Sequence, residues 1–167
     1  MYYAGDDTNK GTGGWGQQRS GINYHIIRYA DVLLMAAEAA VESGSLETAR
    51  GYVNQVRQRA IDGPRADSTP NYSISTYGSA WTDQAVARKA VRFERRLELG
   101  MEGGRLFDLR RWGVMEQTLN AYISNEGRTI PTFQSRAGSV QSKHTALPIP
   151  TEAIDNSQGA LTQNPGY

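Results

Sequence analysis

The residues best suited to chemistry in this sequence are carboxylates that recur among arginines. Glu94, Glu98 and Glu102 follow one another at four-residue steps, so a helix would carry them on one face. Two carboxylates at a suitable separation can hydrolyse a glycosidic bond. However, each of these carboxylates has an arginine within helical reach, and such an arginine lowers the pKa of the carboxyl group, which is the wrong direction for a general acid. A glycosidase is therefore the least favoured hypothesis, and we expect no catalytic residue and no enzymatic activity.

A structural role accounts for the same charges. Carboxylates and guanidinium groups on neighbouring helices can pair, and such pairs fix the register in which the helices pack. We therefore predict a structural ion-pair network formed by Arg28, Asp31, Glu38, Glu94, Arg95, Glu98, Arg105 and Asp108.

Other kinds of site find no support in the sequence. It contains no cysteine, and its two histidines, His25 and His144, lack metal-binding spacing. Gly11, Gly13 and Gly16 match the spacing of a dinucleotide-binding loop, but no strand precedes them and no helix begins at Gly16. The net charge is +1 and the basic residues lie among acidic ones, which is unlike a nucleic-acid-binding surface. We expect no metal, no cofactor and no nucleic-acid partner.

A helical hairpin over residues 22–60 is the clearest element that could position these side chains. Apolar residues recur at three- and four-residue steps on both sides of Gly44, which suits a helix end with positive φ. Ser45 suits the N-cap of the second helix, and Gly63 followed by Pro64 ends it. The spacing matches one tetratricopeptide repeat. The residues predicted to be buried are Ile22, Ile26, Tyr29, Leu33, Ala36, Ala37, Ala40, Leu46, Ala49, Val53, Val56 and Ala60.

Further helices are predicted over residues 82–123. The first, over 82–103, has Thr82 as its N-cap and a predicted buried stripe of Val86, Ala90, Phe93, Leu97 and Met101. The next is predicted to bury Leu106, Phe107, Leu109 and Trp112, and to continue to Ile123. Loops are predicted over 1–21, 61–81 and 124–146. The tail is rich in proline and predicted to be extended, with at most one helical turn at Thr151–Asp155.

Length and composition fit one all-α domain with long irregular loops. The chain has 167 residues, of which 38% are hydrophobic and 21% charged, so residues 1–167 can form a single domain with a core. No apolar run approaches the length that spans a bilayer. The first ten residues lack the basic start and apolar core of a secretory signal.

Three motifs stand in order along the chain. The first combines NYHIIRYADVLLM from Asn23 with VNQVRQRA from Val53. The second combines ERRLEL from Glu94 with RLFDLRRWG from Arg105, and the third combines LPIP from Leu147 with QNPGY, which ends at Tyr167. Together, and in this order, they closely resemble the C-terminal region of the SusD/RagB family, from about Asn23 to Tyr167.

The resemblance implies a role as well as a fold. Members of this family are non-catalytic, surface-exposed lipoproteins of the outer membrane that bind oligo- or polysaccharides and deliver them to a TonB-dependent, SusC-like transporter. The implied fold is α-helical with tetratricopeptide-like hairpins. Family members are longer, so the resemblance also implies that further hairpins, the signal peptide and the lipidated cysteine lie upstream. Membrane attachment would then be through a lipid anchor outside this chain.

Aromatic residues on loops are the candidates for glycan contact that follow from this resemblance. Sugars present apolar faces that stack on Trp and Tyr side chains. The candidates are Trp81, Tyr77 and Tyr72, with Trp15 less favoured, and ordinary packing is the competing role for each. The leading hypothesis is a glycan-binding component of a nutrient-uptake system. The alternative is a helical repeat-type module for protein–protein interaction that binds no sugar.

Overall fold

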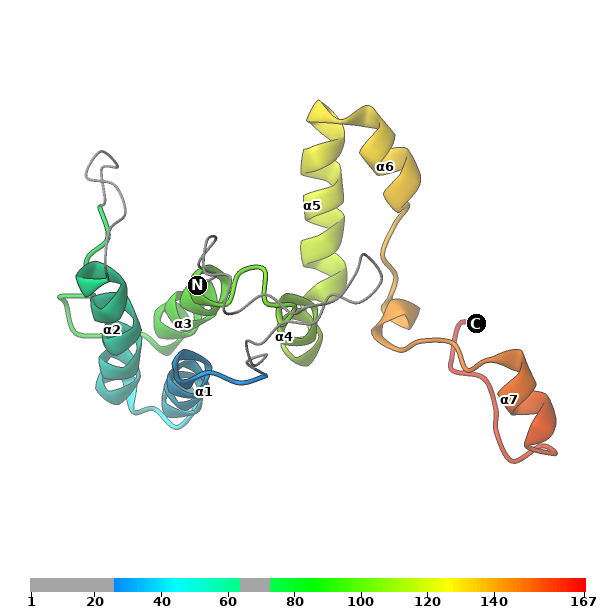
Figure 1. Ribbon diagram of the computed structural model, residues 1–167, viewed down its shortest axis with the longest axis horizontal. Helices are drawn as coiled ribbons and strands as arrows, with labels where there is room; N and C mark the ends of the chain where they lie inside the picture. The colour runs from blue at the N-terminus through cyan, green and yellow to red at the C-terminus, as the bar shows by residue number, and fades with distance from the viewer. Residues whose placement is uncertain (1–25, 64–72) are drawn as a thin grey trace, which may run out of the picture. The chain divides into compact units, whose positions relative to one another are not determined.

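The computed structural model describes residues 26–63 and 73–167, and every regular element in these ranges is helical (Figure 1). This confirms the predicted all-α fold class. The chain divides into two compact units, one ending at Glu98 (unit 1) and one from Leu99 to Tyr167 (unit 2). The assignment of 1–167 to one domain stays a prediction. Within the described ranges, no helix combines the length and the hydropathy needed to cross a bilayer.

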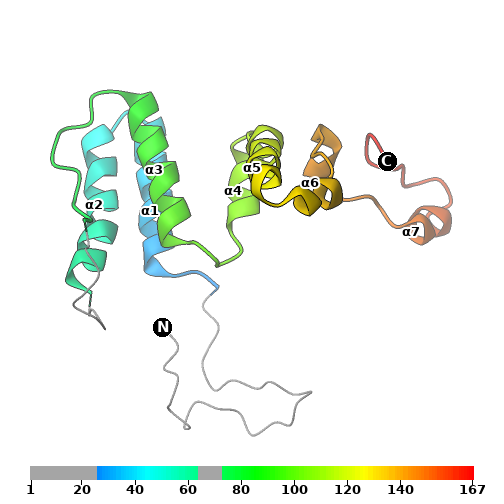
Figure 2. The same ribbon diagram turned by 90° about the horizontal axis from the view of Figure 1, so that it is seen from above.

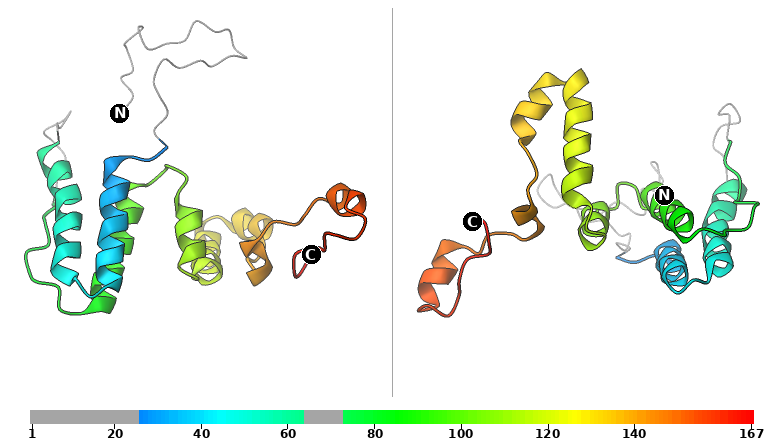
Figure 3. Two further views of the ribbon diagram at one scale, coloured as in Figure 1. Left: turned by 90° about the horizontal axis from the view of Figure 1, so that it is seen from below. Right: turned by 180° about the vertical axis from the view of Figure 1, so that it is seen from behind.

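Unit 1 begins with the predicted hairpin. Helix α1 (Tyr29–Glu42) and helix α2 (Leu46–Asp62) pack side by side in opposite directions (Figures 2 and 3). Gly44 forms the turn with a φ of 81°, a conformation that glycine adopts without strain. Ser45 occupies the N-cap position of α2, but its side chain makes no capping hydrogen bond. The assignment to a tetratricopeptide repeat stays a prediction.

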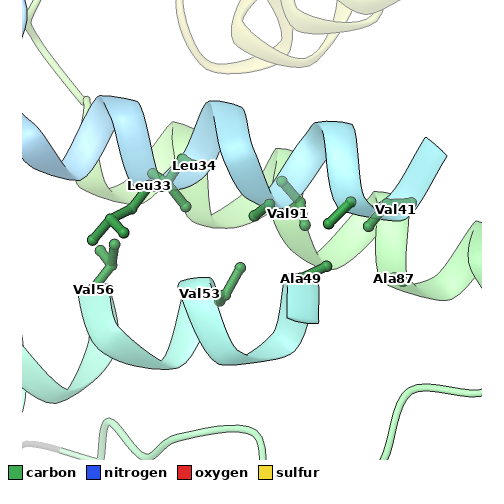
Figure 4. Packing of buried hydrophobic residues seen from close by; sticks show 10 residues of the cluster. Leu33, Leu34, Val41, Ala49, Val53, Val56, Ala87 and Val91 are labelled. Atoms are coloured by element: carbon green, nitrogen blue, oxygen red, sulfur yellow. The ribbon is translucent and has the colours of Figure 1, made fainter. Parts of the chain in front are cut away.

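The core of unit 1 lies where α1 and α2 meet helix α3 (Gln84–Glu98). It is built largely from alanine and valine, whose small side chains let the helices approach closely (Figure 4). The prediction for the start of α1 was wrong: Ile26, which is 86% exposed, precedes the helix, and Tyr29, which is 71% exposed, is its first residue. Ile22 lies outside the described residues. The buried residues are Leu33, Leu34, Ala37, Ala40, Val41, Ala49, Val53, Val56, Ala87 and Val91.

Helix α3 buries a different face from the predicted one. Its buried residues are Ala87, Val91, Glu94 and Arg95, whereas Val86, Phe93 and Leu97 are 52–58% exposed and Met101 lies beyond the helix, fully exposed. The physical reason is that Asp31 of α1 pairs with Arg95, and Arg57 of α2 pairs with Glu94, so the neighbouring helices hold these two charged residues of α3 on the inward face. Asp83 rather than Thr82 caps the helix, since its Oδ1 accepts the N–H groups of Ala85 and Val86.

An extended segment joins α2 to α3. Residues 73–83, which we call the strap, run back along α2, so that α3 starts beside the beginning of α2 (Figure 2). Helices α2 and α3 therefore run in the same direction, and α1 runs opposite to both.

Unit 2 contains helices α4 (Arg105–Arg111), α5 (Met115–Thr129), α6 (Pro131–Ala137) and α7 (Thr151–Asn156) and a 3-10 helix, η2 (Ser142–Thr145). The prediction of an irregular segment over 124–146 was wrong, because these residues include the end of α5, all of α6 and all of η2. Pro131 starts α6, as proline does at a first helical position. In α4, Leu109 is buried as predicted, but Leu106 and Phe107 are 46% and 65% exposed. Helix α7 matches the single turn predicted at Thr151–Asp155.

Side-chain amides hold the extended parts of unit 2. The Gln163 amide donates to the carbonyl of Ile149 at 2.9 Å and accepts its N–H at 2.8 Å. The Asn120 amide likewise donates to the carbonyl of Val140 at 2.8 Å and accepts its N–H at 2.9 Å. The LPIP and QNPGY motifs are therefore in contact.

Candidate functional site

The strap carries the two aromatic candidates that the structure describes, Trp81 and Tyr77. Both are half-buried, and both pack against the core of unit 1. Their rings meet edge to face, with centroids 5.3 Å apart and an interplanar angle of 71°. The other two candidates, Tyr72 and Trp15, lie outside the described residues.

A stripe of polar side chains on α2 holds the strap in place. Asn54 donates to the Tyr77 carbonyl at 3.0 Å and accepts the Tyr77 N–H at 2.8 Å. Arg50 donates to the same carbonyl at 2.7 Å. Glu47 accepts the Trp81 N–H at 2.7 Å. Since residues 47, 50 and 54 stand three and four positions apart, they share one face of the helix.

Arg57 extends this stripe by one further turn. Its Nε donates to the carbonyl of Ser75 at 2.6 Å, and its guanidinium carbon lies 4.9 Å from the centroid of the Tyr77 ring. The strap is thus fixed at three levels along α2, and Trp81 is held at the level of the first turn of that helix.

An open depression lies beside Trp81, with a volume of about 600 Å³. It lies where the turn between α1 and α2 meets the end of the strap. Its lining combines an indole ring, a carboxylate and three hydroxyl groups, the mixture that a sugar ring with its apolar face and its hydroxyls requires. The lining residues are Gly44, Ser45, Leu46, Glu47, Thr48, Trp81 and Thr82.

Glu47 is the one charged residue that lines the depression. Hydrogen bonds from the Arg50 side chain and from the Trp81 N–H lower the pKa of this carboxyl group. The same pairing with Glu47 raises the pKa of Arg50. Glu47 is therefore an ionised hydrogen-bond acceptor at neutral pH, which suits binding and positioning rather than proton donation. Burial raises the pKa of the Tyr77 hydroxyl, which stays protonated.

Sequence reasoning named Trp81 but missed the polar lining around it. Glu47, Thr48 and Thr82 come together only because the strap returns to the start of α2. No periodicity in the sequence encodes that return.

The structure brings several of the predicted network residues together. In unit 1, Arg95 donates to Asp31 at 2.8 Å, and Arg28 hydrogen-bonds both the carboxylate and the carbonyl of Glu98. Glu94 pairs with Arg57 at 2.7 Å. In unit 2, Asp108 is buried and pairs with Arg111 at 2.9 Å, while Arg105 lies over the Trp112 ring. Glu38 is half-buried on α1.

Two arginines of this network were absent from the prediction. Arg57 pairs with Glu94, and Arg59 donates to both carboxylate oxygens of Glu98 at 2.7 and 2.8 Å. Both belong to the VNQVRQRA motif, where they follow the buried Val56. Their partners are 37 and 39 residues away, so only the fold reveals the pairs.

Glu94 and Glu98, which the glycosidase hypothesis would use, are therefore each paired with arginine. Within the described ranges, no group of three or more His, Cys, Asp or Glu side chains is arranged to hold a metal ion. The arrangement beside Trp81 presents an indole ring, one carboxylate and three hydroxyl groups to a ligand.

Comparison with known proteins assigns this architecture to a family. The profile of the SusD family matches residues 2–167. SusD-like protein P2 of Formosa agariphila is 30% identical over 167 residues, covering 99% of this chain and 29% of that protein. SusD-like protein P25 of the same organism is 33% identical over 132 residues, covering 79% of this chain and 22% of that protein.

Two solved structures share the fold at similar identity. A SusD homolog from Bacteroides thetaiotaomicron has a TM-score of 0.68 and 31% identity, covering 90% of this chain and 28% of its own. A SusD superfamily protein from Bacteroides vulgatus has a TM-score of 0.60 and 33% identity, covering 84% of this chain and 27% of its own. The chain thus spans less than a third of the length of these relatives.

Proposed function

The chain belongs to the SusD family, and from this premise we propose that it is a carbohydrate-binding component of an outer-membrane nutrient-uptake system. The observation that carries the proposal is the match of the family profile to residues 2–167. In this role the protein binds oligo- or polysaccharide at the cell surface and delivers it to a TonB-dependent, SusC-like transporter. It is attached to the outer membrane by a lipid anchor outside these residues.

The proposed point of contact with the glycan is the depression beside Trp81. The indole ring supplies a surface for the apolar face of a sugar, and the hydroxyl groups of Thr48 and Thr82 supply partners for its hydroxyls. The strap holds Trp81 through its own main chain, so the ring is positioned before the ligand arrives. Such preorganisation reduces the entropy lost on binding.

The proposed role is non-catalytic. Glu94 is paired with Arg57, and Glu98 is paired with Arg28 and Arg59. Both carboxylates are thus engaged in ion pairs between helices. A reducing-sugar assay against a polysaccharide panel tests this part of the proposal, and sugar release above that of the buffer would overturn it.

Trp81→Ala tests the contact itself. We expect this variant to bind polysaccharide at least about tenfold more weakly than the parent, since stacking on one aromatic ring contributes on the order of 1.5 kcal/mol. Affinity electrophoresis and calorimetry measure the affinity. Because Trp81 also packs on Tyr77, Thr48→Val serves as a second variant that leaves this packing intact. Unchanged affinity in both variants would remove the depression from the site.

A second candidate function is a helical module for protein–protein interaction. The observation that favours it is the exposed apolar face of α3, formed by Val86, Phe93 and Leu97. Both functions predict co-purification with a co-expressed SusC-like transporter, and only the first predicts glycan binding, so the two measurements together distinguish them. Loss of co-purification in Phe93→Asp, together with no glycan binding by the parent, would favour the interaction module.

A further inference from the structure

Helix α3 has more apolar surface than unit 1 covers. Ala87 and Val91 are buried in the core with α1 and α2, whereas Val86, Phe93 and Leu97 are 52–58% exposed. The exposed residues follow one another at steps of seven and four positions, so they form one stripe along the helix. The apolar side of α3 is therefore wider than its contact with the other two helices, and an exposed apolar stripe of this kind marks an interaction surface.

The charges of α3 are divided between its two sides. Its carboxylates, Glu94 and Glu98, are both held in ion pairs, with side chains 5% and 9% exposed. Lys89 and Arg96, by contrast, are exposed. They stand four positions before and three positions after Phe93, so both border the apolar stripe. The outward side of α3 therefore combines apolar side chains with positive charge.

This combination favours an anionic lipid surface over other occupants. Helices that lie in the plane of a membrane place an apolar stripe in the lipid, while Lys and Arg at its border extend their charged groups to the phosphates. Asp83, the acidic residue just before α3, does not oppose such a contact, because its Oδ1 accepts the N–H groups of Ala85 and Val86 at the start of the helix. The SusD-like family is generally associated with the outer membrane, so a lipid surface lies within reach.

We propose that the outward side of α3, which we call the α3 face, docks on an anionic lipid surface. This inference rests on the proposed function, in which a lipid anchor outside these residues attaches the protein to the outer membrane. An acyl chain and a basic patch bind a membrane together more strongly than either does alone. The α3 face supplies the second contact and turns this side of unit 1 towards the membrane. It consists of Val86, Lys89, Phe93, Arg96 and Leu97.

The test uses the full chain and vesicles of two compositions. One is pure phosphatidylcholine, which has no net charge, and the other is an equimolar mixture of phosphatidylcholine and the anionic phosphatidylglycerol. Co-sedimentation measures the bound fraction at low and at high salt. One variant combines Lys89→Gln with Arg96→Gln, and a second variant carries Phe93→Ser.

Unit 2 offers a matched control for each variant. Arg128→Gln combined with Arg136→Gln removes the same charge from two exposed positions. Phe107→Ser removes an aromatic ring that is 65% exposed. Thermal unfolding monitored by circular dichroism shows whether each variant keeps its fold.

We expect the parent to bind the anionic vesicles at least about tenfold more strongly than the neutral ones, and to lose this preference at high salt. Loss of both Lys89 and Arg96 should weaken binding to the anionic vesicles about 25-fold, since each basic residue near an anionic surface contributes about fivefold. Phe93→Ser should weaken it about fivefold, because roughly half of the ring is left to be buried in the lipid. The control variants should match the parent.

Several results would overturn the inference. These are equal binding of the parent to both kinds of vesicle, no binding to either, or unchanged binding in the Lys89→Gln, Arg96→Gln variant. An equal loss in the control for charge would also overturn it, because binding would then depend on net charge and not on the α3 face. If the parent binds no vesicle and the same variant loses co-purification with a co-expressed SusC-like transporter, the α3 face binds protein and the inference fails.

Failure of this inference can be told apart from failure of the proposed function. A parent protein that binds polysaccharide but no vesicle refutes the lipid contact and leaves glycan binding in place. A parent protein that binds the anionic vesicles through the α3 face but binds no polysaccharide supports the lipid contact and refutes the proposed glycan binding.

Discussion

The ion pair between Arg57 of α2 and Glu94 of α3 should stabilise unit 1 far more than the ion pair between Arg88 of α3 and Glu42 of α1. Both join two helices, and their shortest nitrogen–oxygen distances are nearly equal, at 2.7 and 2.6 Å. They differ in burial. The side chains of Arg57 and Glu94 are 15% and 5% exposed, whereas those of Arg88 and Glu42 are 31% and 48% exposed.

This difference in burial sets the expected magnitudes. Glu94→Gln keeps the shape of the side chain but removes its charge, so the partly buried Arg57 guanidinium loses its counter-ion. Removing one partner of a buried pair costs on the order of 3–5 kcal/mol. Arg57 keeps the Ser75 carbonyl and the Tyr77 ring as partners, so we expect a loss at the low end, about 3 kcal/mol. Glu42→Gln removes an exposed pair, which is worth about 1 kcal/mol or less.

Hydrogen exchange measured by mass spectrometry distinguishes these values within unit 1. A loss of 3 kcal/mol raises the open fraction of a cooperative unit about 150-fold, since each 1.36 kcal/mol is a factor of ten. Peptides from α2 should therefore exchange about 150-fold faster in Glu94→Gln, and at most about fivefold faster in Glu42→Gln. Urea unfolding monitored by circular dichroism gives an independent ranking. Equal effects of the two variants, or a larger effect of Glu42→Gln, would refute the argument from burial.

Two further predictions concern the strap and the tail. The folded-state pKa of Glu47 lies below its ordinary value of 4.5, so its contribution to stability is present above pH 4.5 and is lost as the pH falls through the folded-state pKa. We therefore expect fluorescence of Trp81, measured with the other tryptophans replaced by Phe, to report release of the Trp81 end of the strap as the pH falls below 4.5. Glu47→Gln should abolish this transition, and an identical pH profile in that variant would contradict the assignment. In the tail, Gln163→Leu removes both hydrogen bonds to Ile149, each of which contributes about 1 kcal/mol. We expect residues 157–167 of this variant to become susceptible to limited proteolysis. Equal cleavage rates of variant and parent would disprove this prediction.

The hairpin could be predicted because its signals are local. Apolar spacing on both sides of Gly44 is a property of consecutive residues, and a turn with a φ of 81° favours glycine for steric reasons alone. The buried residues Ala49, Val53 and Val56 followed from the same periodicity. The start of α1 did not follow, because an apolar pattern can extend beyond the residues that are helical, as it does at Ile26.

The prediction for α3 shows the limit of periodicity. The stripe that contains Val86, Phe93 and Leu97 has helical spacing, yet it faces outward. The buried face contains Glu94 and Arg95 instead. A helical pattern states which residues share a face, but the choice of the inward face depends on what the neighbouring helices offer.

The sequence by itself determined that this protein is all-α, that it carries a hairpin around Gly44, and that its three motifs resemble the SusD/RagB family. These are properties of neighbouring residues or of their order along the chain. The tertiary structure alone decided which face of α3 is buried, which arginine pairs with which carboxylate, and that Glu47 meets Trp81. The reason is physical: ion pairs and main-chain contacts such as Arg57 with Glu94 and Glu47 with Trp81 join residues 37 and 34 positions apart, and only the packed helices bring them within hydrogen-bonding distance.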